Sequence, residues 1–247
     1  MNEAMSTNTS TSTNMTTNMR IALIRHGAYE QLKNVPSALQ PFPLTEEGEL
    51  EVRHQARAFG EWLKQTGSKL NPEIDSSTLL RAWQTASIYI EELRDYFDGE
   101  PQVRCYSALC ERSVGAVANL PIDEIERVMT LDPRFDTPPE NWKSDSYYCL
   151  PFDGAESLMQ AGQRVADHLQ SWKASEKNPS LIKLFVGHGA SIRHCAFHLN
   201  IITFPDIKRL SMFYGHPVVF DFADNKKAKL LFGGWKIRQT HEHEVPD

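Results

Sequence analysis

The chain lacks the long apolar run that a membrane-spanning helix needs. None of its hydrophobic stretches approaches the roughly 20 residues required to cross a bilayer. It also lacks an excess of basic residues, because 26 lysines and arginines stand against 32 acidic residues and leave a net charge of -6. This balance argues against nucleic acid or an anionic membrane as the main partner, although it leaves room for a local cationic pocket.

Cysteine is scarce as well. The four cysteines, Cys105, Cys110, Cys149 and Cys195, show no CxxC spacing. This usage predicts reduced, buried thiols in a cytoplasmic protein and not a disulfide framework.

The first 18 residues contain almost only Met, Ser, Thr and Asn. They have neither the apolar core of a secretory signal nor the arginines of a mitochondrial presequence. We therefore expect a disordered tail over residues 1–18 and a folded domain over residues 19–247.

Within that domain, short apolar runs alternate with helical patterns, which predicts an α/β fold around a mostly parallel sheet. Residues 112–153 are irregular, with one short helix near 121–130, and form a candidate cap segment. Thr45 is a predicted N-cap, and Asp153 with Glu156 suggests a capping box for a helix at 155–173. A closing hairpin is expected with Asn225 in its turn. The expected strands are 21–25, 73–77, 103–109, 181–187, 217–222 and 228–233, and the other expected helices are 45–64, 79–97 and 190–199.

The first expected strand runs directly into Arg25, His26 and Gly27. In open α/β sheets, ligands bind beyond the carboxyl ends of the strands. A guanidinium at that place can hold an oxyanion, and an imidazole can act as a nucleophile, a base or a metal ligand.

Three later segments bring further residues of the same kind. Arg81 lies at an expected helix start, Glu111 follows an expected strand, and His188 stands between two glycines after another buried strand. Together with Pro43–Gly48 (PLTEEG) and Gly154–Ser157 (GAES), they resemble the PLTxxG and GxES elements and the catalytic motifs of the histidine phosphatase superfamily, the phosphoglycerate-mutase-like proteins. The resemblance extends in order from residue 19 to about residue 235.

The resemblance implies a three-layer sandwich, with helices on both sides of a mostly parallel central sheet and a small cap. It also implies a phosphohistidine intermediate on His26, phosphate binding by Arg25, Arg81 and His188, and proton transfer by Glu111. His26 must then be neutral at its attacking nitrogen, which nearby arginines favour, and its other nitrogen is most simply held by a backbone carbonyl. Glu111 must be protonated to donate, whereas His188, if protonated, adds a further donor. This chemistry requires no metal and no cofactor.

His194 and His198 lie four residues apart on an expected helix, a spacing that can pair metal ligands. No HExxH glutamate accompanies them, because Cys195 follows His194. Packing or surface exposure is the expected role of both.

The chain departs from the family pattern after Gly27. Tyr29 stands where many members have Ser or Thr, and Leu32 where they have Asn. The cap segment has four cationic and eight acidic residues, a poor clamp for a second phosphate, so hydrolysis is favoured over mutase chemistry. A mutase-type phosphotransferase and a non-catalytic phosphate-binding scaffold remain the alternatives.

The substrate stays open between a phosphorylated small molecule and a phosphoprotein. The cap aromatics either line the leaving-group pocket or pack the cap onto the sheet. These aromatics are Phe135, Trp142, Tyr147, Tyr148 and Phe152.

Overall fold

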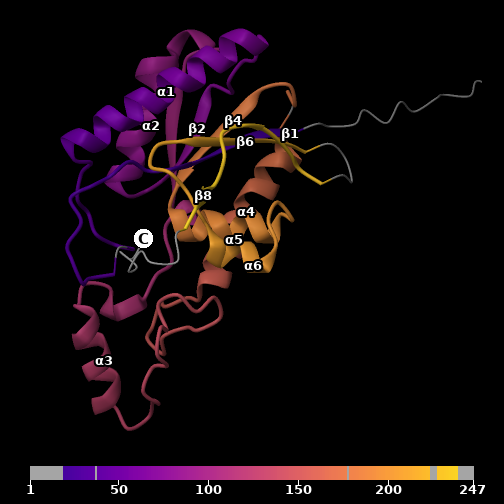
Figure 1. Ribbon diagram of the computed structural model, residues 1–247. Coiled ribbons are helices and arrows are strands. Elements are labelled where there is room, and N and C mark those ends of the chain that lie inside the picture. The colour runs from indigo at the N-terminus through magenta and orange to yellow at the C-terminus, as the bar shows by residue number, and fades with distance from the viewer. Residues whose placement is uncertain (1–18, 37, 177, 223–226, 239–247) are drawn as a thin grey trace, which may run out of the picture.

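The computed structural model describes residues 19–36, 38–176, 178–222 and 227–238. A six-stranded sheet lies between two layers of helices, and a smaller lobe that carries α3 extends from one end (Figure 1). This architecture confirms the predicted α/β sandwich. The expected tail at 1–18 and the turn at Asn225 lie outside the described residues.

The sheet has the strand order β3-β2-β4-β1-β6-β7. The first four strands in that order are parallel, whereas β6 runs antiparallel to β1 and β7 antiparallel to β6. The closing hairpin is therefore confirmed. The strands are β1 (Met19–Arg25), β2 (Glu73–Ser77), β3 (Gln102–Tyr106), β4 (Ile182–Gly187), β6 (Pro217–Phe222) and β7 (Lys229–Phe232).

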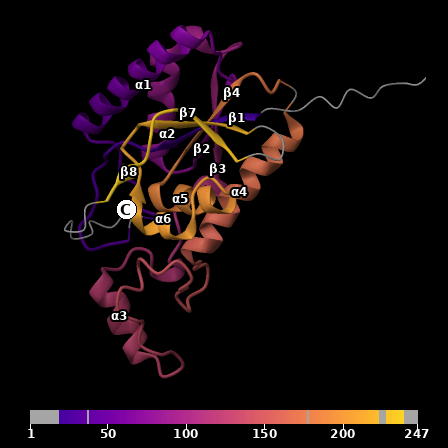
Figure 2. The same cartoon turned by 45° about the vertical axis from the view of Figure 1, so that its right-hand side comes forward.

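Alternating residues of β1 pack into two separate hydrophobic cores. Ala22 and Ile24 belong to the core under α1 (Glu46–Thr66) and α2 (Leu80–Leu93). Ile21 and Leu23 belong to the core on the opposite face, which is covered by α4 (Leu158–Ser175) and α5 (Gly189–His198). Figure 2 shows these two helix layers on either side of the sheet. Burial of both strand faces explains why β1 reads as a continuous apolar run.

The start of α1 explains the PLTEEG element. Thr45 is the N-cap, as predicted, and its hydroxyl accepts a hydrogen bond from the Gly48 amide at 3.0 Å. A Cβ on Gly48 would lie 2.1 Å from the Ala28 carbonyl oxygen. Only glycine therefore lets the helix approach the loop that follows His26 so closely.

The predicted cap of α4 was wrong. The capping box is formed by Ser157 and Gln160, so the helix starts at Leu158 and not at residue 155. Glu156 is not part of it, because its carboxylate binds the Ser113 amide at 3.1 Å and the side chain of Arg164. Asp153 and Glu156 have the three-residue spacing of a capping box, but Arg164, eight residues after Glu156, binds the Glu156 carboxylate instead.

Other boundaries shift at strand and helix ends. β3 stops at Tyr106 and continues as a 3₁₀ turn over Ser107–Leu109, and α2 stops at Leu93 before a 3₁₀ turn over Arg94–Tyr96. The sequence reading missed α6 (Phe204–Arg209) and a small two-stranded sheet of β5 (Leu210–Ser211) and β8 (Lys236–Ile237).

The expectation of buried cysteines holds only for Cys195. Cys105 and Cys149 are exposed, and Cys110 is half-buried. Within the described ranges, every helix is too short or too polar to cross a bilayer.

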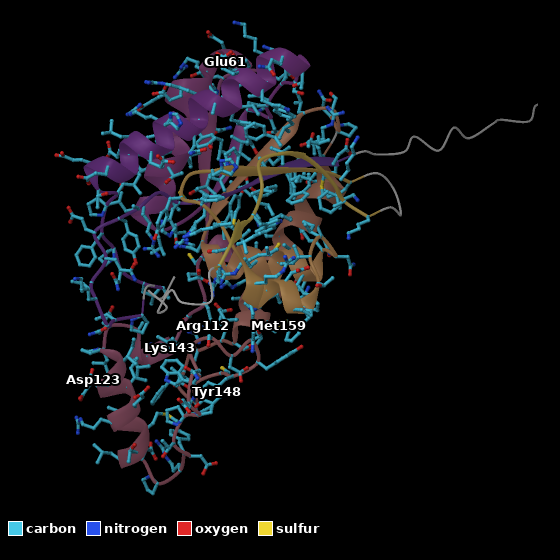
Figure 3. All side chains as sticks on the ribbon, in the orientation of Figure 1. Glu61, Arg112, Asp123, Lys143, Tyr148 and Met159 are labelled. Atoms are coloured by element: carbon cyan, nitrogen blue, oxygen red, sulfur yellow. The ribbon has the colours of Figure 1, made fainter. Side chains whose placement is uncertain are left out.

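The cap segment (residues 112–153) has a core of its own. Trp142, Leu150 and the α3 (Ile122–Leu131) residues Ile125 and Met129 form its centre. Phe135, Tyr148 and Phe152 pack against that centre, while Tyr147 is 65% exposed. Most of the cap aromatics thus stabilise the cap itself, and neither of the two expected roles describes them. In Figure 3, Arg112 and Met159 lie where this lobe meets the helices of the main body.

Candidate active site

The site begins where β1 and β4 end side by side. Arg25 pairs with Gly187 in the parallel register of these strands, so His26 and His188 follow at the same edge of the sheet. Their ring centroids are 4.9 Å apart. Both histidines are almost fully buried, with 4% and 1% exposure.

His26 is held in one tautomer. Its Nδ1 lies 2.7 Å from the Gly27 carbonyl oxygen, which can only accept, so Nδ1 carries the proton. Its Nε2 accepts a hydrogen bond from Arg81 Nε at 3.3 Å. The backbone carbonyl expected from the sequence is therefore present, and it leaves the Nε2 lone pair facing the site. The Gly27 amide is fixed in turn by the Thr85 hydroxyl at 3.0 Å.

Arg81 is the second residue of α2 and joins the two histidines. Besides His26, its guanidinium binds His188 Nδ1 at 3.2 Å and the Gln40 carbonyl oxygen at 2.7 Å. The guanidinium carbon lies 4.4 Å over the Tyr29 ring. Burial lowers the pKa of Arg81, yet an arginine remains charged at neutral pH. A fixed positive charge therefore lies next to His26 Nε2.

His188 is neutral in this arrangement. Because Nδ1 accepts from Arg81, Nε2 carries the proton and donates to the Ser77 hydroxyl at 2.9 Å. Burial, followed by the charge of Arg81, holds the pKa of His188 well below its usual range. In this arrangement His188 accepts from Arg81 through Nδ1, which differs from the cationic donor considered from the sequence.

Arg25 is held from the opposite side. Its Nη1 donates to the Met212 carbonyl oxygen and its Nη2 to the Tyr214 hydroxyl, both at 3.2 Å. Its guanidinium carbon also lies 4.1 Å over the Tyr214 ring. A Cβ on Gly189 would lie 3.2 Å from Arg25 Nε, so the glycine makes room for this arginine.

Glu111 lies two residues beyond the 3₁₀ turn and not directly after a strand. Its Oε1 accepts from the amides of Ser191 at 3.0 Å and Arg112 at 2.8 Å. Its Oε2 accepts from the Ala190 amide at 3.1 Å. The carboxylate therefore sits on the N-terminus of α5, immediately after His188. Three amide donors therefore fix the position and orientation of the carboxylate.

Arg164 of α4 fixes the turn that carries Glu111. Its Nη1 donates to the carbonyl oxygens of Ser107 at 3.1 Å, Ala108 at 2.8 Å and Cys110 at 3.2 Å. Its other nitrogens bind the Glu156 carboxylate at 3.2 and 2.5 Å. The GAES element therefore contributes to the site indirectly, through an arginine that orients the Glu111 turn.

Sequence reasoning missed Ser77 and Tyr214 as neighbours of the predicted residues. Ser77 ends β2 at the same sheet edge, so the rule that identified His26 could have identified it. Tyr214 precedes β6 in a loop without a motif, and only the fold brings it to Arg25. Leu32, at the position where the family often has Asn, is 50% exposed.

His194 and His198 make only intramolecular contacts within the described structure. His194 lies between the Ala190 carbonyl oxygen at 2.8 Å and the Ser146 hydroxyl at 3.1 Å, and burial lowers its pKa to about 4. His198 binds the Met159 carbonyl oxygen at 3.1 Å. Ser146 belongs to the cap segment, so His194 helps fasten the cap to α5.

Two arginines, two histidines and a carboxylate thus come together at one edge of the α/β sheet, beyond the carboxyl ends of parallel strands, where proteins of this fold class bind ligands. The chain belongs to the histidine phosphatase superfamily (branch 1), whose family model matches residues 21–233. The chain therefore belongs to the enzyme family that its sequence motifs indicated.

Similar proteins include a mutase and phosphatases. A 2,3-bisphosphoglycerate-dependent phosphoglycerate mutase of Neisseria meningitidis is 31% identical over 232 residues, covering 85% of this chain and 97% of the relative. A mycobacterial glucosyl-3-phosphoglycerate phosphatase superposes with a TM-score of 0.59 at 22% identity, covering 86% of this chain and 96% of that one. A putative alpha-ribazole-5'-P phosphatase of Escherichia coli superposes with a TM-score of 0.61 at 20% identity, covering 86% and 94%. The two structural similarities show the shared fold.

Proposed function

We propose that this protein is a phosphomonoester hydrolase that forms a phosphohistidine on His26 and uses Glu111 as general acid and base. The observation that carries the proposal is the state of His26. Its Nδ1 proton is bound to the Gly27 carbonyl, so Nε2 has a lone pair, and this nitrogen lies beside the charged Arg81. An activated nucleophile beside fixed positive charge is what phosphoryl transfer needs.

Attack by His26 requires one contact of the site to break. Arg81 Nε now donates to the nitrogen that would attack. A phosphoryl oxygen is a stronger acceptor for a guanidinium than a neutral imidazole, because the hydrogen bond is then charged on both sides. Substrate binding would thus free Nε2 for attack and keep Arg81 on the transferring group.

The reaction then proceeds in two displacements. Nε2 of His26 forms a bond to phosphorus while the bond from phosphorus to the ester oxygen breaks, and Glu111 gives its proton to the departing alkoxide. In the second step Glu111 takes a proton from water as the water oxygen attacks phosphorus and the bond to Nε2 breaks. Glu111 Oε2 is the oxygen suited to carry the proton, because Oε1 accepts two amide hydrogen bonds and Oε2 accepts one.

The charge of the cap segment supports hydrolysis over mutase chemistry. Arg127 binds Glu124 at 2.8 Å and Arg134 binds Asp132 at 2.9 Å, both within the cap. These two arginines are therefore already neutralised by acidic neighbours. A bisphosphate would need free cations on this side of the pocket.

A phosphoglycerate-mutase-type activity is the second candidate. The 31% identity to the Neisseria mutase favours it. So do Arg112 and Lys143, which are linked by a hydrogen bond of 3.4 Å from the Arg112 guanidinium to the Lys143 carbonyl oxygen. Arg112 directly follows Glu111 and stacks on Trp142 at 5.6 Å. Arg112 is the cap cation that adjoins Glu111 in the chain, a position from which it could bind a second anionic group of a substrate.

One set of assays separates the candidates. An aryl phosphate and a panel of phosphorylated metabolites and phosphopeptides, including alpha-ribazole phosphate and glucosyl-3-phosphoglycerate, should yield inorganic phosphate with the wild type and not with His26→Ala. Activity should persist in a chelator. Interconversion of phosphoglycerates primed by 2,3-bisphosphoglycerate, faster than phosphate release, would favour the mutase. Phosphate binding without any turnover would leave a non-catalytic scaffold, and loss of activity in a chelator with recovery in Mg²⁺ would contradict the metal-free mechanism.

A further inference from the structure

Tyr29 carries a buried hydroxyl without a hydrogen-bond partner among the described residues. The side chain is 8% exposed, and its oxygen is inaccessible to solvent. Burying a hydroxyl without a partner destabilises a fold, so such groups are rare and call for an explanation. A role in ligand binding or catalysis is one such explanation.

The backbone around Tyr29 is fixed in place. Tyr29 forms an isolated antiparallel bridge with Leu44. On either side of it, the Glu30 amide binds the Pro43 carbonyl at 3.1 Å, and the Thr45 amide binds the Ala28 carbonyl at 3.0 Å. The N-terminus of α1 thus holds the residue, and the hydroxyl position is a consequence of the fold and not of a loose loop.

The ring lies in the site. It packs edge-on against His26, with ring centroids 5.3 Å apart and planes at 84°, and its face contacts the Arg81 guanidinium. The hydroxyl also interacts electrostatically with Arg81, Arg25, Glu111 and Tyr214, which come from four different parts of the chain. Burial raises the pKa of Tyr29, so the hydroxyl keeps its proton at neutral pH and can donate.

We propose that the Tyr29 hydroxyl donates a hydrogen bond to an oxygen of the phosphoryl group bound at His26. The proposal rests on the proposed function, because it assumes that His26 is where phosphate binds. It assigns Tyr29 a direct contact with the transferring group and gives the buried, unpaired hydroxyl its hydrogen-bond partner. A hydrogen bond from a neutral donor to a charged acceptor predicts a loss of about ten- to hundredfold in affinity when the hydroxyl is removed.

The test removes only the oxygen. Dissociation constants of inorganic phosphate and vanadate are measured by calorimetry for wild type, Tyr29→Phe and a matched control, Tyr96→Phe. Tyr96 is half-buried in the 3₁₀ turn after α2, at the end of that helix away from Arg81. The unfolding temperature of each variant is measured in the absence of ligand. We expect Tyr29→Phe to bind both anions about ten- to hundredfold more weakly, with an unfolding temperature equal to or above that of the wild type, and Tyr96→Phe to bind as the wild type does.

Unchanged anion affinity in Tyr29→Phe would overturn the inference while leaving the hydrolase proposal intact, since turnover by wild type is measured separately. A lower unfolding temperature together with unchanged affinity would make Tyr29 a packing residue. If anion binding depends on Tyr29 but the wild type shows no turnover, the inference is supported and the hydrolase proposal is contradicted. A wild type that binds neither anion would overturn both.

Discussion

Replacing Glu111 by Gln should change rate and stability separately, and the structure sets the size of each effect. The carboxylate accepts three amide hydrogen bonds, from Arg112, Ala190 and Ser191. A Gln carbonyl can keep the two on Oε1, but its NH₂ group would face the Ala190 amide, donor against donor. The unsatisfied amide costs about 1–3 kcal/mol. Loss of the negative charge at the start of α5 adds about 0.3–1 kcal/mol.

The kinetic effect depends on the leaving group. An alkoxide leaving group needs the proton of Glu111, whose transfer is typically worth about 10²–10⁴-fold. An aryl phosphate leaves as a more stable anion and should lose about tenfold at most. kcat/KM is measured for an alkyl and an aryl phosphate at a temperature well below the unfolding midpoint of both proteins. The free energy of unfolding is measured separately in urea.

The matched control is Glu126→Gln. Glu126 accepts the Trp142 indole N–H at 3.0 Å within the cap, and among the described residues it makes no hydrogen bond to His26 or His188. It should leave both rates unchanged. Equal, small losses on the two substrates in Glu111→Gln would refute the assignment of Glu111 as the proton donor and reduce it to a cap for α5.

Two further predictions concern buried charge away from the site. Asp75→Asn should destabilise the fold by about 3–5 kcal/mol in urea unfolding, because Lys183, 1% exposed, would lose the carboxylate 2.7 Å away and keep only that of Glu73 at 3.9 Å. A loss below about 1 kcal/mol would contradict this. His194, with its pKa lowered from 6.5 to about 4 by burial, binds a proton in the unfolded chain before it does so in the folded one. Stability should therefore fall as the pH drops from about 6.5 to about 4, by about 3 kcal/mol from this residue. His194→Gln should flatten that slope, whereas the exposed control His54→Gln should not; equal slopes in all three proteins would assign the acid sensitivity elsewhere.

The features predicted best from the sequence are those that depend on residues close together in the chain. The strands β1 and β4 were visible as short apolar runs, and the residues just beyond them meet because parallel strands end at one edge. The tautomer of His26 was also expected, since its partner is the carbonyl of the next residue, Gly27.

Contacts between distant segments were not visible in the sequence. Arg164 lies more than 50 residues from the Glu111 turn that it holds, and its competition for Glu156 explains the wrong capping prediction for α4. The cap aromatics were expected to face the pocket or the sheet, but Trp142 packs with α3 in a core that no periodicity in an irregular segment reveals. The neutral state of His188 likewise depends on burial and on Arg81, two features that the fold creates.

The most direct measurement of the central claim is the position of the phosphate on the trapped enzyme. Wild type, His26→Ala and His198→Ala are mixed with an aryl phosphate, quenched within the first turnover under alkaline conditions, and examined by peptide mass spectrometry and ³¹P NMR. Because Nδ1 of His26 is bound to the Gly27 carbonyl oxygen, the phosphate should be on Nε2 of His26 in wild type and His198→Ala, and absent from His26→Ala. Phosphate on Nδ1, on another residue, or on no residue during active turnover would contradict the account.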